Sequence, residues 1–138
     1  MRPIAFSIVS SAFALMILGG FAPPQSSGKS VVVNMLHDAR GMRYEPSRIT
    51  IARGDTVKFV NISGGPHNVE FDRGTVPAEA ISALSAAMST ELGDLKGDLI
   101  SAPNASFTIV FHDVPPGKYR FFCTPHGREG MSGTITVK

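Results

Sequence analysis

Hydrophobic and polar residues alternate in short runs along most of the chain, and Gly and Pro separate the runs. In residues 56–61 the apolar side chains of Val57 and Phe59 fall on one face, which is the period of a half-buried β-strand. Other runs with strand character are residues 31–36, 44–51, 67–71, 107–111, 118–123 and 133–137. We expect limited solvent exposure for the β-branched run at 31–36. Short strands at this spacing predict an all-β sandwich or barrel.

One segment departs from this period. Residues 77–92 are rich in alanine, and Ile81, Leu84 and Met88 recur at helical spacing before Gly93. The pattern predicts one short amphipathic helix that packs on the sandwich. We expect Met88 to be a core residue and not a metal ligand.

The first residues have the composition of an export signal. Arg2 precedes an apolar run at 4–18, and small residues and prolines follow. We predict that 1–28 form a signal peptide and short leader, cleaved between about residues 20 and 28. The absence of an arginine pair indicates a Sec-type signal, which places the protein in the periplasm or cell envelope. Since a membrane span needs about 20 apolar residues, contact with the membrane is expected only if this segment stays uncleaved.

Length and charge limit what the remaining residues 29–138 can be. A chain of 138 residues predicts one domain after the signal, and we expect a monomer. With 13 Lys+Arg against 11 Asp+Glu and no basic run, the sequence gives no support for a nucleic-acid partner. The single cysteine excludes an intrachain disulfide, an iron–sulfur cluster and any CxxC site.

The residues that carry chemistry lie mainly in one loop between two predicted strands. Cys123, His126 and Met131 fall within nine residues, and a second histidine, His67, follows a Gly/Pro turn. A thiolate, two imidazoles and a thioether are the donor set of a blue-copper centre. A cysteine at a strand end and a histidine three residues later can turn back to one point, and the methionine returns from the far side of the loop.

Two other kinds of site use some of the same residues. A zinc site would more usually recruit a further Cys, His or carboxylate than a thioether. A thiol nucleophile paired with His126 would need oxyanion donors and an orienting acid, and Pro125 offers no N–H. His37 and His112 stand beside aspartates at strand ends, and we interpret them as solvated surface imidazoles. No second histidine cluster is present to bind oxygen, so we predict that the protein is not an enzyme.

Several motifs resemble those of the cupredoxins, the type 1 blue-copper family, and in particular its plastocyanin-like members. The resemblance covers residues 31–138. It implies a cupredoxin-like Greek-key β-sandwich that holds one copper ion, cycling between Cu(I) and Cu(II), near one end. The implied ligands are His67, Cys123, His126 and Met131. The motifs that carry the resemblance are Tyr44-Glu45-Pro46 with Ile49-Thr50-Ile51, Gly54 to Phe59, Pro66-His67-Asn68-Val69, Tyr119 to His126 and Gly130-Met131.

The resemblance also implies roles for residues around the ligands. The Asn68 side chain is expected to tie its segment to the cysteine loop through Thr124, and a backbone N–H there is placed to donate to the Cys123 sulfur. Pro125 removes a competing donor beside that sulfur. Pro66 stiffens the opposite wall.

The resemblance implies an exported one-electron carrier. Electrons would pass at the exposed edge of His126, within an apolar rim that includes Met42, Pro66 and Pro125, with the charge of Arg128 nearby. The partners would be redox proteins such as a c-type cytochrome or an oxidoreductase complex, met by transient docking.

The alternative function is an envelope protein that delivers or sequesters copper. It would use the same ligands, but the chain lacks the Met- or His-rich tracts expected of a copper-loading surface. Phe122 stands before Cys123, where plastocyanins usually carry a tyrosine, and residues 72–75 do not form an acidic cluster. The resemblance therefore implies the copper site, but it does not imply a photosynthetic partner.

Overall fold

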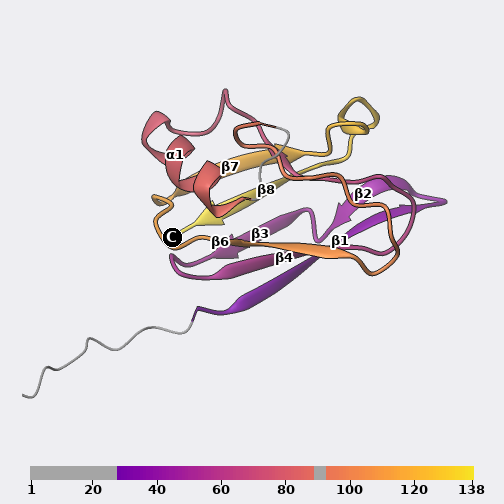
Figure 1. Ribbon diagram of the computed structural model, residues 1–138, viewed down its shortest axis with the longest axis horizontal. Coiled ribbons are helices and arrows are strands. Elements are labelled where there is room, and N and C mark those ends of the chain that lie inside the picture. Colours follow the sequence, from indigo (N-terminus) through magenta and orange to yellow (C-terminus); the bar gives the residue numbers. More distant parts are fainter. Residues whose placement is uncertain (1–27, 89–92) are drawn as a thin grey trace, which may run out of the picture.

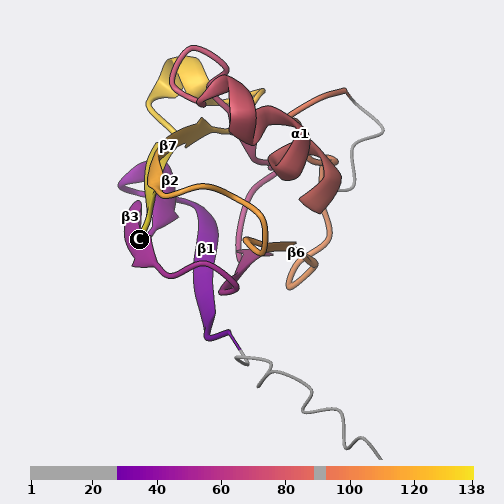
Figure 2. The same cartoon turned by 90° about the vertical axis from the view of Figure 1, so that its left-hand side faces the viewer.

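The computed structural model describes residues 28–88 and 93–138, and these form two four-stranded β-sheets packed face to face (Figures 1 and 2). The strand order is β2-β1-β4-β6 in one sheet and β3-β8-β7-β5 in the other. This confirms the predicted all-β sandwich. The strands are β1 (Ser30–Asp38), β2 (Gly41–Glu45), β3 (Arg48–Ile51), β4 (Thr56–Asn61), β5 (Glu70–Phe71), β6 (Ser106–Val110), β7 (Gly117–Phe122) and β8 (Ser132–Val137).

The chain crosses repeatedly between the two sheets. β1 pairs in parallel with β4, and β3 pairs in parallel with β8, so neither pair can be joined by a tight turn. β7 and β8 form an antiparallel pair, and the loop that joins them lies at the end of the sandwich opposite the C-terminus (Figure 1).

An aromatic cluster fills the space between the sheets. Phe59 on β4 and Phe121 on β7 are both buried, with ring centroids 5.6 Å apart in an edge-to-face arrangement. Tyr44 on β2 packs edge-on against Phe121 at 4.8 Å. Burial of each such ring contributes about 1.5–3 kcal/mol, and the geometry adds to this. These contacts join the two sheets directly.

The predicted alternation of buried and exposed residues is confirmed on most strands. The expectation of limited solvent exposure throughout residues 31–36 is wrong. Val33 and Met35 on β1 are buried, but Val32 between them is 47% exposed. The run at 31–36 therefore has one solvent face, because only one side of its sheet is covered by the other sheet.

The helix is shorter than predicted. α1 spans Ala78–Ala87, with Leu84 buried as expected, Ile81 partly buried and Ala80 also buried. Met88 has an extended backbone and donates its N–H to the Ser85 carbonyl, so the helix ends there and not at residue 92. The Met88 side chain is buried in the core, which is the predicted role. Residues 89–92 lie outside the described part of the chain.

The strand predicted at 67–71 is also shorter, since only Glu70 and Phe71 belong to β5. The preceding residues pair with a loop segment instead. The His67 N–H donates to Ile100 O at 3.0 Å, and the Gly97 N–H donates to Val69 O at 2.8 Å. The Phe71 N–H likewise donates to Leu95 O at 2.8 Å, so this loop runs along the edge of the segment that faces away from β7.

The predicted signal peptide lies almost wholly in residues 1–27, outside the described part of the chain, and it stays a prediction. No helix within 28–88 or 93–138 is long and apolar enough to cross a membrane.

The Asp55 carboxylate fastens the start of the domain to the turn between β3 and β4. Its Oδ1 accepts the Lys29 N–H at 2.7 Å, and its Oδ2 accepts the Ala52 N–H at 2.9 Å. These two backbone donors hold the pKa of Asp55 below its ordinary value. Asp55 is buried, so an unpaired carboxylate there would be costly.

We therefore expect Asp55→Asn to lower the free energy of unfolding at neutral pH, because an amide can accept only one of the two bonds. A depressed pKa in the folded state means that this stabilisation is present above the unfolded pKa of about 3.9 and is lost as pH falls through the folded value. Urea unfolding at several pH values between neutral and acid checks this. The difference between wild type and variant should shrink on acidification, and a constant difference would contradict the assignment.

Candidate metal centre

The antiparallel ladder of β7 and β8 brings two sulfur-bearing residues opposite each other. Phe122 pairs with Ser132 at the end of the ladder, and the next N–H, from Cys123, donates to Met131 O at 3.0 Å. Alternation along β7 turns Phe121 and Cys123 to the same, interior face, and both Cys123 and Met131 are fully buried. The ladder thus encloses a thiol and a thioether at one end of the sandwich.

The loop between these residues folds His126 back toward Cys123. The His126 N–H donates to Cys123 O at 3.1 Å, and the Met131 N–H donates to His126 O at 3.3 Å. A 3₁₀ turn, η1 (Gly127–Glu129), follows, and Gly130 then takes a left-handed conformation with φ of 87°. Glycine suits this position because it has no Cβ to clash there.

His67 enters from the segment between β4 and β5. Its side chain is fully buried, and its Nε2 lies 3.0 Å from the Ser63 carbonyl oxygen. A carbonyl can only accept, so Nε2 carries the proton and Nδ1 presents its lone pair. Burial also lowers the pKa of His67, which keeps the ring neutral as metal binding requires.

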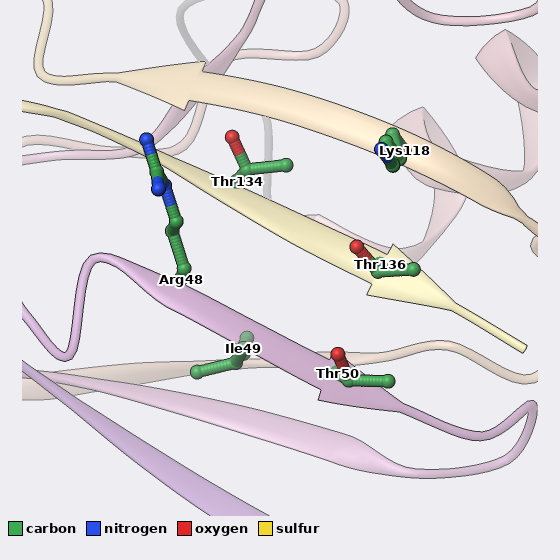
Figure 3. Close-up of a pocket in the computed structure, with 6 residues that line it drawn as sticks. All are labelled: Arg48, Ile49, Thr50, Lys118, Thr134 and Thr136. Atoms are coloured by element: carbon green, nitrogen blue, oxygen red, sulfur yellow. The ribbon is translucent and has the colours of Figure 1, made fainter.

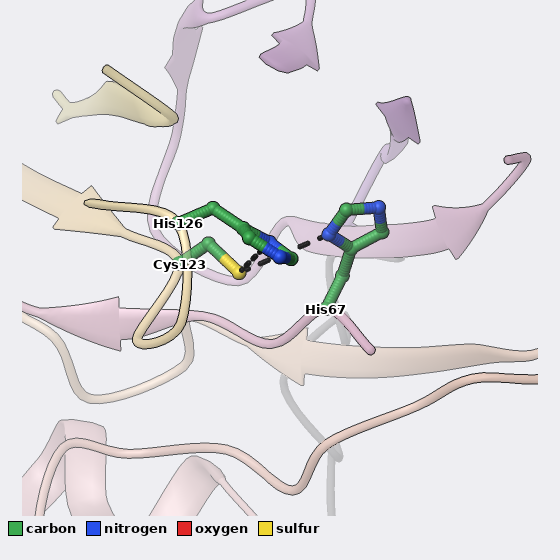
Figure 4. Close-up of side chains that lie close together, drawn as sticks. All are labelled: His67, Cys123 and His126. Atoms are coloured by element: carbon green, nitrogen blue, oxygen red, sulfur yellow. Dashed lines mark hydrogen bonds between the residues drawn. The ribbon is translucent and has the colours of Figure 1, made fainter. Parts of the chain in front are cut away.

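The donor atoms of the three residues converge on one point (Figure 4). The Cys123 Sγ lies 3.8 Å from His67 Nδ1 and 3.4 Å from His126 Nδ1, and the three donor atoms lie within 4.8 Å of one another. Metal–sulfur and metal–nitrogen bonds of about 2.3 and 2.0 Å at trigonal or tetrahedral angles separate S and N by about 3.5–3.7 Å. The arrangement therefore fits a single transition-metal ion.

Two opposing effects act on the pKa of the Cys123 thiol. Burial raises its pKa, while hydrogen bonds from the backbone N–H groups of Asn68 and His126 lower it. A bound metal ion would stabilise the thiolate further, because it would take the place of the thiol proton.

The donor set favours copper over the competing sites. Within residues 28–88 and 93–138, His67, Cys123 and His126 form the one group of His, Cys and carboxylate side chains close enough to hold a metal. A structural zinc site would add a fourth ligand of these types, whereas here the neighbouring buried residue is Met131.

The residues expected around the ligands lie close to them. Asn68 Nδ2 donates to Thr124 Oγ1 at 2.9 Å, and Asn68 Oδ1 accepts the Thr124 N–H at 2.8 Å. Asn68 also donates to Gly97 O at 3.0 Å and is fully buried. One amide thus joins the His67 segment, the cysteine loop and the loop before β6.

Two further polar side chains around the site were not predicted from the sequence. Tyr44 is buried and donates its hydroxyl to Asn68 O at 2.5 Å, and burial raises the pKa of Tyr44 well above its usual value. Glu70 accepts the Thr124 hydroxyl at 2.7 Å and the Lys96 ammonium at 3.3 Å. Alternation along the strand places Tyr44 in the core, and a buried hydroxyl needs a hydrogen-bond partner. The sequence therefore contained a sign that Tyr44 bonds to a buried group. Glu70 gave no such signal, because its contacts depend on the loop at 96–100.

The predicted rim residues differ in exposure. His126 and Met42 are half-buried, whereas Pro66, Pro125 and Arg128 are exposed. His37 and His112 are both exposed, as expected for surface imidazoles.

Comparisons with known proteins agree with this geometry. The family model for copper binding proteins of the plastocyanin/azurin family matches residues 31–138. A plastocyanin from Synechococcus sp. (strain JA-2-3B'a(2-13)) is 37% identical over 126 residues, which cover 88% of this chain and 86% of the relative. A plastocyanin from Scenedesmus fuscus is 40% identical over 108 residues, covering 78% of this chain and 99% of the relative.

Solved structures show the same fold. The oxidised plastocyanin of Dryopteris crassirhizoma superposes with a TM-score of 0.62 at 34% identity, covering 78% of this chain and all of that structure. A pseudoazurin from Sinorhizobium superposes with a TM-score of 0.56 at 30% identity, covering 80% of this chain and 74% of that structure.

These relatives and the converging donor atoms confirm the predicted blue-copper electron carrier with one copper ion, and they do not favour the copper-delivery alternative. The sequence resemblance is likewise confirmed. The chain belongs to the plastocyanin/azurin family of copper-binding proteins.

Proposed function

We propose that the protein carries single electrons between redox proteins by means of one copper ion held by His67, Cys123, His126 and Met131. The observation that carries this proposal is the convergence of Cys123 Sγ with the Nδ1 atoms of both histidines. When bound, copper supplies one-electron chemistry between Cu(I) and Cu(II).

Met131 is proposed as the residue that would supply the fourth donor, a weak thioether. It is buried, and its backbone is bonded to both Cys123 and His126 within the same loop. Long axial thioethers are typical of centres with two histidines and a cysteine in the plane.

The ligands are held by a frame that resists rearrangement. Cys123 is fixed by the β7–β8 ladder, and His67 by its bonds to Ile100 and Ser63. Asn68 and Thr124 join these two parts. Such a frame would keep the donor atoms in the same positions in both oxidation states. This would lower the free energy needed to rearrange the ligands at each electron transfer.

Electrons are proposed to pass at the half-buried ring of His126, the least buried of the ligands expected at this site. We propose Met42, Pro66 and Pro125 as the apolar rim around this ring, with the charge of the exposed Arg128 beside it. An interface of this kind buries a small area and separates quickly, as carriers require.

The proposed partners are redox proteins such as a c-type cytochrome or an oxidoreductase complex, and the proposed location is the periplasm or cell envelope. The signal-like residues 1–28 support export, with membrane contact only if they are retained. The protein is proposed to act as a monomer, and its similarity to plastocyanins supports a role as a carrier and not as an enzyme.

Optical and spin-resonance spectra of the copper-loaded protein, followed through a redox titration, test the carrier function. We expect an intense visible thiolate-to-copper band and a reversible midpoint potential. Irreversible loss of copper on reduction would overturn the proposal.

Replacing Cys123 by Ser should abolish the intense visible band, because a hydroxyl cannot supply the thiolate charge transfer. The measurement is the absorption spectrum after copper loading. Met88→Leu is a matched control, since it exchanges a buried methionine outside the proposed ligand set for a side chain of similar volume. A serine variant that stays blue would rule out Cys123 as the ligand.

Removing the Asn68 side chain should loosen the site without removing a ligand. Asn68→Ala breaks the bonds to Thr124 and Gly97 and should lower the unfolding free energy by about 1–3 kcal/mol. The visible band should remain, while the midpoint potential shifts and copper dissociates faster. Asn34→Ala, at a half-buried position on β1, is the control and should leave all three readouts near wild type. Equal changes of the unfolding free energy, midpoint potential and copper dissociation in the two variants would contradict the role of Asn68 in holding the site together.

A further inference from the structure

Three cationic side chains form an array on the outward face of the second sheet. Along β7, Tyr119 and Phe121 point into the core, so Lys118 and Arg120 point to solvent. Arg48 is exposed on the edge strand β3. We call the surface formed by Arg48, Lys118 and Arg120 the basic face.

The strand register places these residues in two rows. Thr134 on β8 lies opposite both Arg48 on β3 and Arg120 on β7. Two residues farther along, Thr136 lies opposite Lys118. Neighbouring strands are about 4.8 Å apart, so the two arginines arise about 10 Å from each other with a threonine hydroxyl between them.

Two adjoining hollows lie over this array. One has a volume of about 410 Å³ and is lined in part by Arg48, Lys118 and Thr134, and Figure 3 shows the Arg48 side chain extending from β3 across β8. The other has a volume of about 330 Å³ and is lined in part by Arg48, Arg120 and Ser132. Since both include Arg48 and Thr134, they form one continuous polar surface.

The positive charges of the basic face are not neutralised within the described residues. In 28–88 and 93–138, no carboxylate oxygen lies within 4.0 Å of a side-chain nitrogen of Arg48, Lys118 or Arg120. Asp72 follows β5 beside Arg120, but its Oδ1 accepts the Gly74 N–H. By contrast, Arg43 on the first sheet is bonded to the Asp38 carboxylate at 2.6 and 2.8 Å.

The basic face also lies close to the metal centre. Arg120 precedes Cys123 by three residues on β7, which corresponds to about 10 Å along an extended strand. A protein bound over Arg120 would therefore stand beside the end of the sandwich that holds the donor atoms.

We propose that the basic face binds a redox partner protein through carboxylates on the partner's surface. This inference rests on the proposed electron-carrier function. Guanidinium groups bind carboxylates through paired hydrogen bonds, and the intervening hydroxyls can donate to the same oxygens. The formal net charge of the chain is only +2, so attraction of an acidic partner depends on local charge of this kind.

Binding of poly-L-glutamate, a carboxylate probe, tests the proposal without requiring electron transfer. The isotope-labelled Cu(I) protein is titrated at low ionic strength and followed by amide chemical shifts, and the largest changes should map to β3, β7 and β8. Arg48→Gln/Arg120→Gln should weaken binding about tenfold, and physiological salt should weaken wild-type binding in the same direction. Arg53→Gln/Lys58→Gln removes the same charge from other exposed positions and should weaken binding by less than about threefold.

Equal weakening by the two double variants would overturn the proposal. So would shift changes centred on Arg128, or tighter binding of an oligothymidylate of matched charge, which would indicate a phosphate-bearing partner. The Lys118→Gln variant gives a separate check, since it should weaken binding to a smaller extent than the double variant. The midpoint potential of each variant is measured in parallel. An unchanged reversible potential with no binding to the basic face would refute this inference while leaving the carrier function intact.

Discussion

The pairing of β7 with β8 is the constraint on which the site depends. One additional ladder bond beyond Phe122 and Ser132, from the Cys123 N–H to Met131 O, sets both sulfur residues opposite each other at the sheet end. The two-residue period of a strand then decides that both side chains face inward. A slip of one residue in this register would turn the sulfur of the shifted strand to solvent, so the core packing of Tyr119 and Phe121 also protects the metal centre.

The other half of the site depends on contacts between distant segments. His67 comes from a stretch that pairs with Ile100 and not with a full strand, and Asn68 connects this stretch to Thr124. The tautomer of His67 follows from the Ser63 carbonyl. The hydrogen bond that His67 donates to this backbone carbonyl therefore determines which ring nitrogen is available, and no side-chain carboxylate is needed to fix the tautomer.

The sequence predicted the parts of the structure that depend on local periodicity. Alternation located β4 at 56–61, and the Cys-x-x-His and Met spacing located the loop, because a strand end and a tight turn are both local features. The end of α1 was placed too late, because burial of Met88 from an extended backbone depends on the core beneath it. The strand at 67–71 was overextended for a similar reason, since its partner is the loop near Ile100. The Glu70 contact and the basic face were not predicted, since both require a register that joins residues far apart in the chain.

The hydrogen bond from His67 Nε2 to the Ser63 carbonyl affects how many protons are released when a metal binds. Because this ring already has its proton on the outer nitrogen, only the thiol proton of the Cys123–His67 pair must leave when a metal enters. A Cu(I) ion in place of that proton would leave the local charge unchanged, whereas a Cu(II) ion would add one positive unit. The oxidised form would therefore carry one more positive charge than the reduced form at this end of the molecule, beside the half-buried ring of His126.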